Sequence, residues 1–87
     1  MTDTERLWLA ERTYTDRDLV VLVYATPDGD RRLRKELASS MLQRTTVTAA
    51  TEAEPSSLNP VEDEETRRRY ATEVERVSQA HDPDDPI

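Results

Sequence analysis

The chain has 87 residues and a formal net charge of -7, so we expect one small domain and no second domain with its own core. Leu, Ile, Val and Phe supply 16 of the 87 residues, a low share that borders on that of disordered chains. Five of them stand together in Leu19–Val23, which concentrates enough apolar area for a small core. The absence of cysteine excludes disulfides, thiolate–zinc sites and thiol nucleophiles.

Basic residues are almost all arginine, eleven against the single Lys35, and nineteen acidic residues outnumber them. This composition is typical of proteins in molar salt, where hydrated carboxylates maintain solubility, and we therefore expect a halophilic protein. No segment approaches the roughly 18 apolar residues of a membrane span, and the N-terminus lacks the basic and apolar regions of a signal peptide. We expect a cytoplasmic protein that has no membrane partner.

The first half of the chain has the pattern of an antiparallel meander. Arg6–Tyr14 and Leu19–Thr26 are rich in Leu, Val, Trp and Tyr, and the polar Thr15–Asp18 between them has the composition of a four-residue hairpin loop. Within Pro27–Asp30, the central Asp28-Gly29 dipeptide predicts a two-residue turn, because both central residues need positive φ and glycine adopts it without strain.

A third strand is predicted over Arg31–Leu37. The alternative is a helix over Arg31–Leu42 with Leu33, Leu37 and Met41 on one stripe; we favour the strand, followed by a short helical turn at residues 38–42. The Thr- and Ala-rich residues 45–53 indicate a weak strand or extended segment, and residues 55–59 indicate a loop.

A C-terminal helix is predicted from its caps and its spacing. Residues 59–62 match an N-cap Asn, a Pro at the first helical position and a Glu three residues after the cap, and Asp63 is a second candidate start. Tyr70, Val74 and Val77 follow at helical spacing, and Pro83 ends the helix. We expect one domain over residues 1–81 and a loose acidic tail over residues 82–87.

The two turns fix which side chains share a face of the sheet. With Tyr14 opposite Leu19 and Pro27 opposite Asp30, one face is apolar and the helix is expected to lie across it. The fold class is therefore α+β, an antiparallel meander of three or four strands with one C-terminal amphipathic helix on the apolar face. That face carries Leu7, Leu9, Val20, Leu22, Tyr24, Leu33 and Leu37.

The opposite face is too apolar for full solvation and too basic for an ordinary core. Three explanations are open: cover by the chain's own residues 38–58, contact with a second copy in a homodimer, or binding of a ligand. Aromatic rings flanked by arginines suit base stacking and phosphate contact, so single-stranded nucleic acid is the ligand considered. The candidate interface or ligand residues on this face are Trp8, Arg12, Tyr14, Val21, Val23, Arg32 and Arg34.

The other charged motifs have ordinary explanations. Arg67–Arg69 follow three acidic residues at i,i+4 spacing, which stabilises a helix without any nucleic acid. His81 and the aspartates after it lack the glycine and bidentate Glu of a calcium loop. Ser39-Ser40 has no His partner by motif, and one glycine is too few for a phosphate-binding loop. No carboxylate pair stands out, so we expect no catalytic residue, metal or cofactor.

Glu5–Tyr14, then Tyr24–Gly29, then a helix ending in His81–Asp85 resemble a group of short acidic haloarchaeal proteins of unknown function. The resemblance spans nearly the whole chain and implies halophily and a single domain, but no activity. We predict a non-enzymatic interaction module of a halophile, which binds itself or a protein partner. The alternative is single-stranded nucleic-acid binding through the mixed Trp, Tyr and Arg face, and a more distant third hypothesis is an enzyme or enzyme subunit that works through carboxylates.

Overall fold

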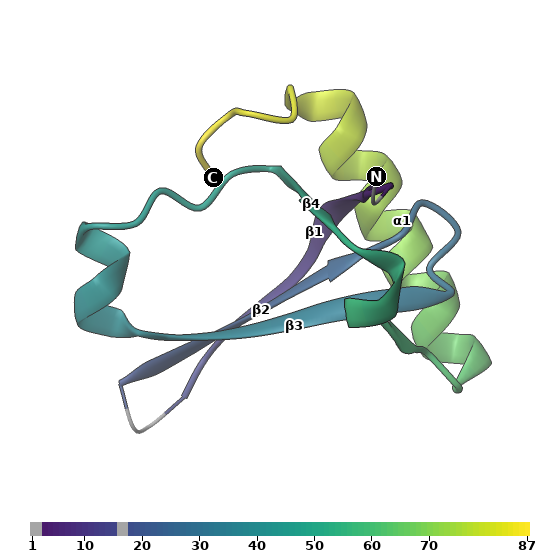
Figure 1. Cartoon of the computed structure of the whole chain (residues 1–87), viewed down its shortest axis with the longest axis horizontal. Helices are drawn as coiled ribbons and strands as arrows, with labels where there is room; N and C mark the ends of the chain where they lie inside the picture. The colour runs from purple at the N-terminus through teal and green to yellow at the C-terminus, as the bar shows by residue number, and fades with distance from the viewer. Residues whose placement is uncertain (1–2, 16–17) are drawn as a thin grey trace.

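The computed structural model describes residues 3–15 and 18–87, and within them the chain forms one antiparallel sheet and one α-helix (Figure 1). The strand order is β4-β1-β2-β3-β5. The α+β class is confirmed, and the sheet has five strands where three or four were predicted. The elements are β1 (Glu5–Tyr14), β2 (Leu19–Ala25), β3 (Arg31–Ala38), η1 (Ser39–Gln43), β4 (Ala50–Ala53), η2 (Pro55–Ser57), β5 (Asn59–Pro60) and α1 (Glu64–Ala80), where η marks a 3-10 helix.

The hairpin between β2 and β3 has the predicted register but a longer turn. Ala25 lies opposite Arg32, which is the register that Pro27 opposite Asp30 requires. The N–H of Gly29 donates to the Thr26 carbonyl at 2.8 Å, and Gly29 is the one residue of this loop with positive φ, at 75°. The connection is therefore a four-residue loop, and Asp28 does not adopt the positive φ of the predicted two-residue turn.

A β-bulge in β1 divides that strand into two parts. Leu9 lies opposite Tyr24, as predicted, but Glu11 lies opposite Val23, so Ala10 is the extra residue. A bulge shifts the pairing by one residue and thereby exchanges the faces of all side chains that follow it.

Beyond the bulge, the predicted register of the first hairpin is wrong. Tyr14 lies opposite Val20 instead of Leu19, and Arg12 and Tyr14 point to the face opposite the one predicted. Asp16 and Arg17, in the middle of the predicted first loop, lie outside the described residues.

Both faces of the sheet are covered by the chain itself. The Leu22 face, with Leu7, Leu9, Val20, Leu22 and Tyr24 as its buried residues, packs against Val47 and Leu58 and also contacts Ile87. The Val23 face, with Val23 and Ala25 buried and Trp8, Ala10 and Val21 partly buried, packs against Val61, Tyr70 and Val74.

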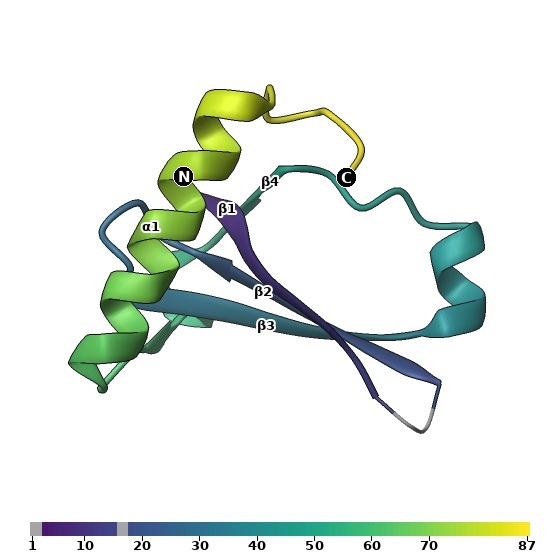
Figure 2. The same ribbon diagram turned by 180° about the vertical axis from the view of Figure 1, so that it is seen from behind.

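The prediction that the helix covers the Leu22 face is therefore wrong. The chain leaves β3 through η1 and must reach β4 on the far side of β1, so it crosses the Leu22 face (Figures 1 and 2). The crossing segment covers the Leu22 face, and the Val23 face is therefore left for α1. Cover by residues 38–58 was one of the three explanations for the opposite face; this cover exists, but on the Leu22 face.

The helix starts at the second of its two predicted caps. Asp63 accepts hydrogen bonds from the main-chain N–H of Thr66 at 2.9 Å and from its hydroxyl at 2.7 Å. Residues 59–60, predicted as the first cap, instead form β5 against Arg31 and Arg32, where a proline is tolerated because it lies at a sheet edge. Of the predicted helical ion pairs, Glu64–Arg68 forms at 3.0 Å, whereas Arg69 pairs with Glu11 of β1 at 3.5 Å.

The last residues differ from the loose tail that was predicted. The N–H of Ala49 donates to Asp85 at 2.9 Å, and the N–H of Ile87 donates to Val47 at 2.8 Å. The tail thus lies beside the segment that crosses the Leu22 face (Figure 2). The main-chain groups of that crossing segment need partners, and the tail supplies them.

Candidate interaction surface

The structure separates the seven predicted interface residues into two groups. Trp8, Val21 and Val23 share the Val23 face, where they pack against the buried cluster that α1 completes. Arg32 and Arg34 lie on the same face of β3, opposite Ala25 and Val23. The remaining two residues of the prediction, Arg12 and Tyr14, lie on the Leu22 face because of the bulge.

Arg12 holds the C-terminal tail against β1. Its Nη2 donates to the main-chain oxygen of Ile87 at 2.6 Å, while its Nε is buried and has no hydrogen-bond partner among the described residues. A hollow of about 280 Å³ lies beside it, between the bulge and the end of α1. Two acidic and two arginine side chains line this hollow, and one of these arginines, Arg76, pairs with Glu73 at 2.7 Å, so the hollow has no concentration of one charge.

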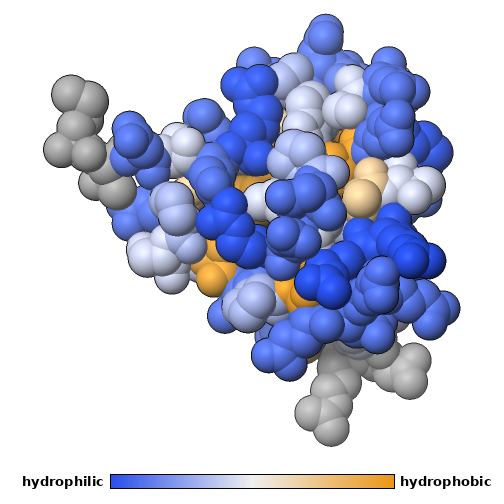
Figure 3. Space-filling view, turned by 90° about the vertical axis from the view of Figure 1, so that its right-hand side faces the viewer, coloured by the Kyte–Doolittle hydropathy of each residue, from blue (hydrophilic) through white to orange (hydrophobic). Residues whose placement is uncertain are grey.

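The outer face of α1 is hydrophilic. Figure 3 views the molecule from the side on which α1 lies and shows small apolar patches within a mostly hydrophilic surface. Among the side chains that the structure describes, the large apolar ones that are exposed are those of Tyr14, which is 65% exposed, and Met41, which is 46% exposed. Both residues lie away from α1: Tyr14 is the last residue of β1, and Met41 lies in η1.

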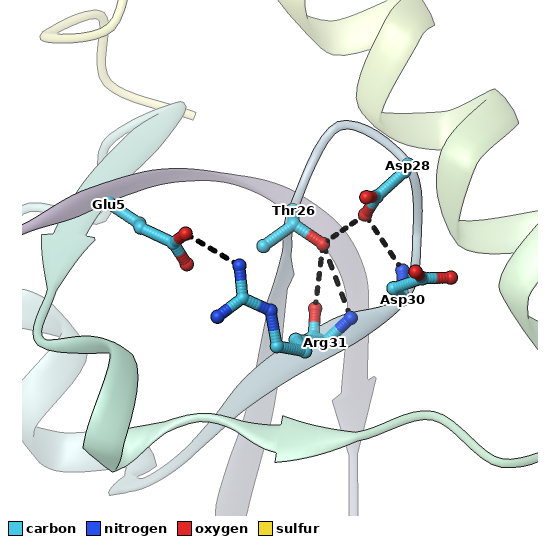
Figure 4. A network of polar contacts seen from close by, with 5 residues as sticks. All are labelled: Glu5, Thr26, Asp28, Asp30 and Arg31. Atoms are coloured by element: carbon cyan, nitrogen blue, oxygen red, sulfur yellow. Dashed lines mark hydrogen bonds and ion pairs between the residues drawn. The ribbon is translucent and has the colours of Figure 1, made fainter.

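A polar network fastens the second hairpin to the start of β1 (Figure 4). The buried hydroxyl of Thr26 donates to Asp28 Oδ1 at 2.6 Å, and this carboxylate also accepts from the N–H of Asp30 at 3.0 Å. Arg31 reaches Glu5 at 2.5 Å. The hydrogen bond from Thr26 and that from the Asp30 main chain lower the pKa of Asp28. These contacts fix a turn, and they leave β3 in a defined position at the sheet edge.

The outer edge of β3 is open beyond Arg32. Among the described residues, β5 pairs only with Arg31 and Arg32, and Figures 1 and 2 show no strand on the outer side of the rest of β3, the side away from β2. The N–H of Thr26 donates to the carbonyl of Arg31 at 3.0 Å, so the main-chain groups of Arg31 point toward β2. Because these directions alternate along a strand, the main-chain groups of Arg34, Glu36 and Ala38 point outward.

Side chains along this open edge are charged on one face and mixed on the other. Arg34 and Glu36 lie on the Val23 face and pair with each other at 2.7 Å, each about half exposed. Leu33, Lys35 and Leu37 lie on the Leu22 face, where the Lys35 ammonium stands 5.6 Å from the centre of the Tyr24 ring. The open edge, defined here as Leu33–Ala38, therefore presents both signs of charge beside two half-buried leucines.

The sequence predicted Arg34 as an interface residue but missed Glu36 and the edge itself. An edge depends on strand order, and nothing in residues 33–38 indicates that β5 stops at Arg32. Charged side chains such as those of Arg34, Lys35 and Glu36 are common on edge strands. They are the sequence signal from which the open edge could have been predicted.

Two further properties bear on function. Among residues 3–15 and 18–87, no group of three or more His, Asp or Glu side chains is arranged to hold a metal ion. Within the same residues, no helix has the length and apolar character that crossing a bilayer requires.

The chain belongs to a family of unknown function (DUF7967), whose profile matches residues 1–87. Comparison with curated proteins and with solved structures gave no significant match.

Proposed function

We propose that this member of the DUF7967 family is a non-enzymatic interaction module that works in the cytoplasm of a halophile and docks a protein partner on the open edge of β3. The partner adds an extended strand beside Leu33–Ala38. Main-chain hydrogen bonds supply the attachment in this mode of recognition, and the flanking side chains supply the selectivity.

The observation that carries the proposal is the unpaired main chain of β3. Beyond Arg32, the outward N–H groups of Arg34, Glu36 and Ala38 have no strand beside them in the described part of the chain. The inner edge of the same strand is paired with β2 throughout, from Ala38 opposite Leu19 to Arg32 opposite Ala25. The strand is thus held in an extended conformation before a partner arrives, which reduces the entropy cost of docking.

Single-stranded nucleic acid receives less support as the partner. Stacking on Trp8 requires an open ring, but this side chain packs against the cluster that α1 completes. The predicted binding face is also divided, because Arg12 and Tyr14 lie on the other side of the sheet.

The proposal is tested by blocking the edge without changing the rest of the sheet. Glu36→Pro removes an outward N–H, whereas Glu36→Ala removes the side chain and keeps the N–H, and circular dichroism verifies that both fold. Tagged chain, incubated with high-salt extract that has been treated with nuclease, should retain proteins in the wild type and in Glu36→Ala and lose them in Glu36→Pro. Equal retention by all three chains would contradict docking at this edge. Proteins that the wild type retains from an untreated extract but not from the nuclease-treated one would favour nucleic acid.

A further inference from the structure

We infer that the strand accepted by the open edge is the same edge of a second copy, so that two β3 strands pair antiparallel and join two sheets into one. This inference rests on the proposed function, because it names the partner of the surface proposed there. It is carried by three observations: the length of the open edge, the position of β5 beside it, and the order of charges along it.

The main-chain directions restrict the register of such a pair. Outward groups belong to Arg34, Glu36 and Ala38, so in a symmetric pair these residues must lie opposite one another. A register centred on Lys35 would place Ala38 opposite Arg32 of the other copy, a position that Asn59 of β5 already occupies. A register centred on Glu36 avoids this conflict.

In the register centred on Glu36, the main-chain hydrogen bonds are satisfied, and the two Glu36 carboxylates, which lie directly opposite one another, depend on the Arg34 side chains to offset their repulsion. The two Glu36 residues exchange main-chain hydrogen bonds, and each Ala38 N–H donates to the Arg34 carbonyl of the other copy. On the Val23 face, each Arg34 lies diagonally across from Glu36 of the other copy, within reach of a long side chain. The existing pair at 2.7 Å thereby becomes a neutral cluster of two arginines and two glutamates.

The Leu22 face of the same pair is also compatible. Lys35 lies opposite Leu37 of the other copy, so its aliphatic stem covers a half-buried leucine while its ammonium stays in solvent. Ser39, the first residue of η1, comes opposite Leu33, which brings the exposed Met41 of η1 toward the second copy. An uncharged foreign strand would leave Arg34 and Glu36 without these partners, and a second copy is therefore the better match.

Charge reversal gives a test that a purely structural role does not reproduce. Arg34→Glu creates four glutamates in the cluster of a pair, and Glu36→Arg creates four arginines. Each variant alone should sediment as a monomer, with the dissociation constant of the dimer raised at least about tenfold relative to the wild type. An equimolar mixture should form the heterodimer, because every Glu then faces an Arg, and the double variant R34E/E36R should dimerise as the wild type does.

The register has its own test in Ala38→Pro. Ala38 has φ -64°, which suits proline, so the fold should be kept while the N–H that bonds to Arg34 of the other copy is lost. We expect this variant to sediment as a monomer with an unchanged melting temperature. A dimeric Ala38→Pro chain would overturn the register centred on Glu36.

Sedimentation of the wild type separates failure of this inference from failure of the proposed function. A wild type that remains monomeric at several hundred micromolar, or a mixture of the two charge variants that remains monomeric, overturns pairing between copies. Loss of another protein partner in Glu36→Pro would still support the docking edge in that case. If Glu36→Pro changes neither self-association nor partner retention, both proposals fail.

Discussion

Gly29 is the residue at which the fold depends most directly on backbone geometry. Its φ is 75°, and a Cβ built on it would lie 2.2 Å from the carbonyl oxygen of Arg67 in α1. Glycine is required here both for the turn and for the close approach of the hairpin to the helix. The single glycine of the chain therefore joins the sheet to α1.

Gly29→Ala should destabilise the fold by about 2 to 4 kcal/mol, because it combines a strained backbone with a clash against main-chain atoms that cannot move aside. Urea unfolding followed by circular dichroism measures the change. A useful control is Asp18→Gly, since Asp18 holds a positive φ of 57° without being glycine, and the substitution should be neutral or slightly stabilising. A cost below 0.5 kcal/mol for Gly29→Ala would contradict the contact with α1.

The carboxylate of Asp28 makes stability depend on pH at the acidic end. Hydrogen bonds from Thr26 and from the Asp30 main chain lower its pKa in the folded state. A lowered folded-state pKa means that the unfolded chain binds the proton more tightly, so the contribution is present above pH about 4 and is lost as the pH falls through the folded-state pKa. Asp28→Asn should lose this part of the acid dependence, measured as the free energy of unfolding between pH 5 and pH 2. Identical slopes for variant and wild type would contradict it.

At the scale of elements, local sequence patterns predicted the first three strands and the helix. They did not predict how elements that are far apart in the sequence pack on one another. The turn residues around Gly29 set the register of β2 and β3 correctly, because a short loop leaves few pairings. The bulge at Ala10 has no local signal, since Leu-Ala-Glu fits a regular strand equally well, and it moved Arg12 and Tyr14 to the other face. The helix was found from Tyr70, Val74 and Val77, but the face it covers depends on where the crossing segment runs, which no local pattern determines.

The buried positions of β2 test the two-sided core that results. Leu22, on the Leu22 face, is 2% exposed, and Val23, on the opposite face, is 3% exposed. Leu22→Ala should cost about 2 to 5 kcal/mol, and Val23→Ala should also destabilise because α1 covers it. Urea unfolding measures both, with the exposed Glu54→Ala as a control within about 0.5 kcal/mol of the wild type. If one face of the sheet were solvated, only one of the two substitutions, Leu22→Ala or Val23→Ala, would lower the free energy of unfolding, and the other would be neutral.

The whole molecule carries its charge unevenly. Residues 1–44 contain eight basic and eight acidic residues, whereas residues 45–87 contain four basic and eleven acidic ones, which accounts for the net charge of -7. The acidic half includes α1 and the tail, which pack against the sheet and together contain seven of its eleven acidic residues. Repulsion among these carboxylates therefore opposes the packing of the covering layers on the sheet.

Stability should consequently rise with salt concentration. The Debye length is about 10 Å at 0.1 M salt and about 3 Å at 1 M, so repulsion between neighbouring carboxylates is screened only near molar salt. We expect the melting temperature, followed by circular dichroism, to increase steadily from dilute buffer to molar KCl.

Salt also strengthens burial of apolar groups, and a variant with Glu52→Gln, Glu54→Gln and Glu62→Gln separates the two effects. This variant should be more stable than the wild type in dilute buffer and should gain less from KCl. Equal gains in both proteins would assign the effect to apolar burial, and a melting temperature that does not change with KCl would contradict the halophilic character predicted from composition.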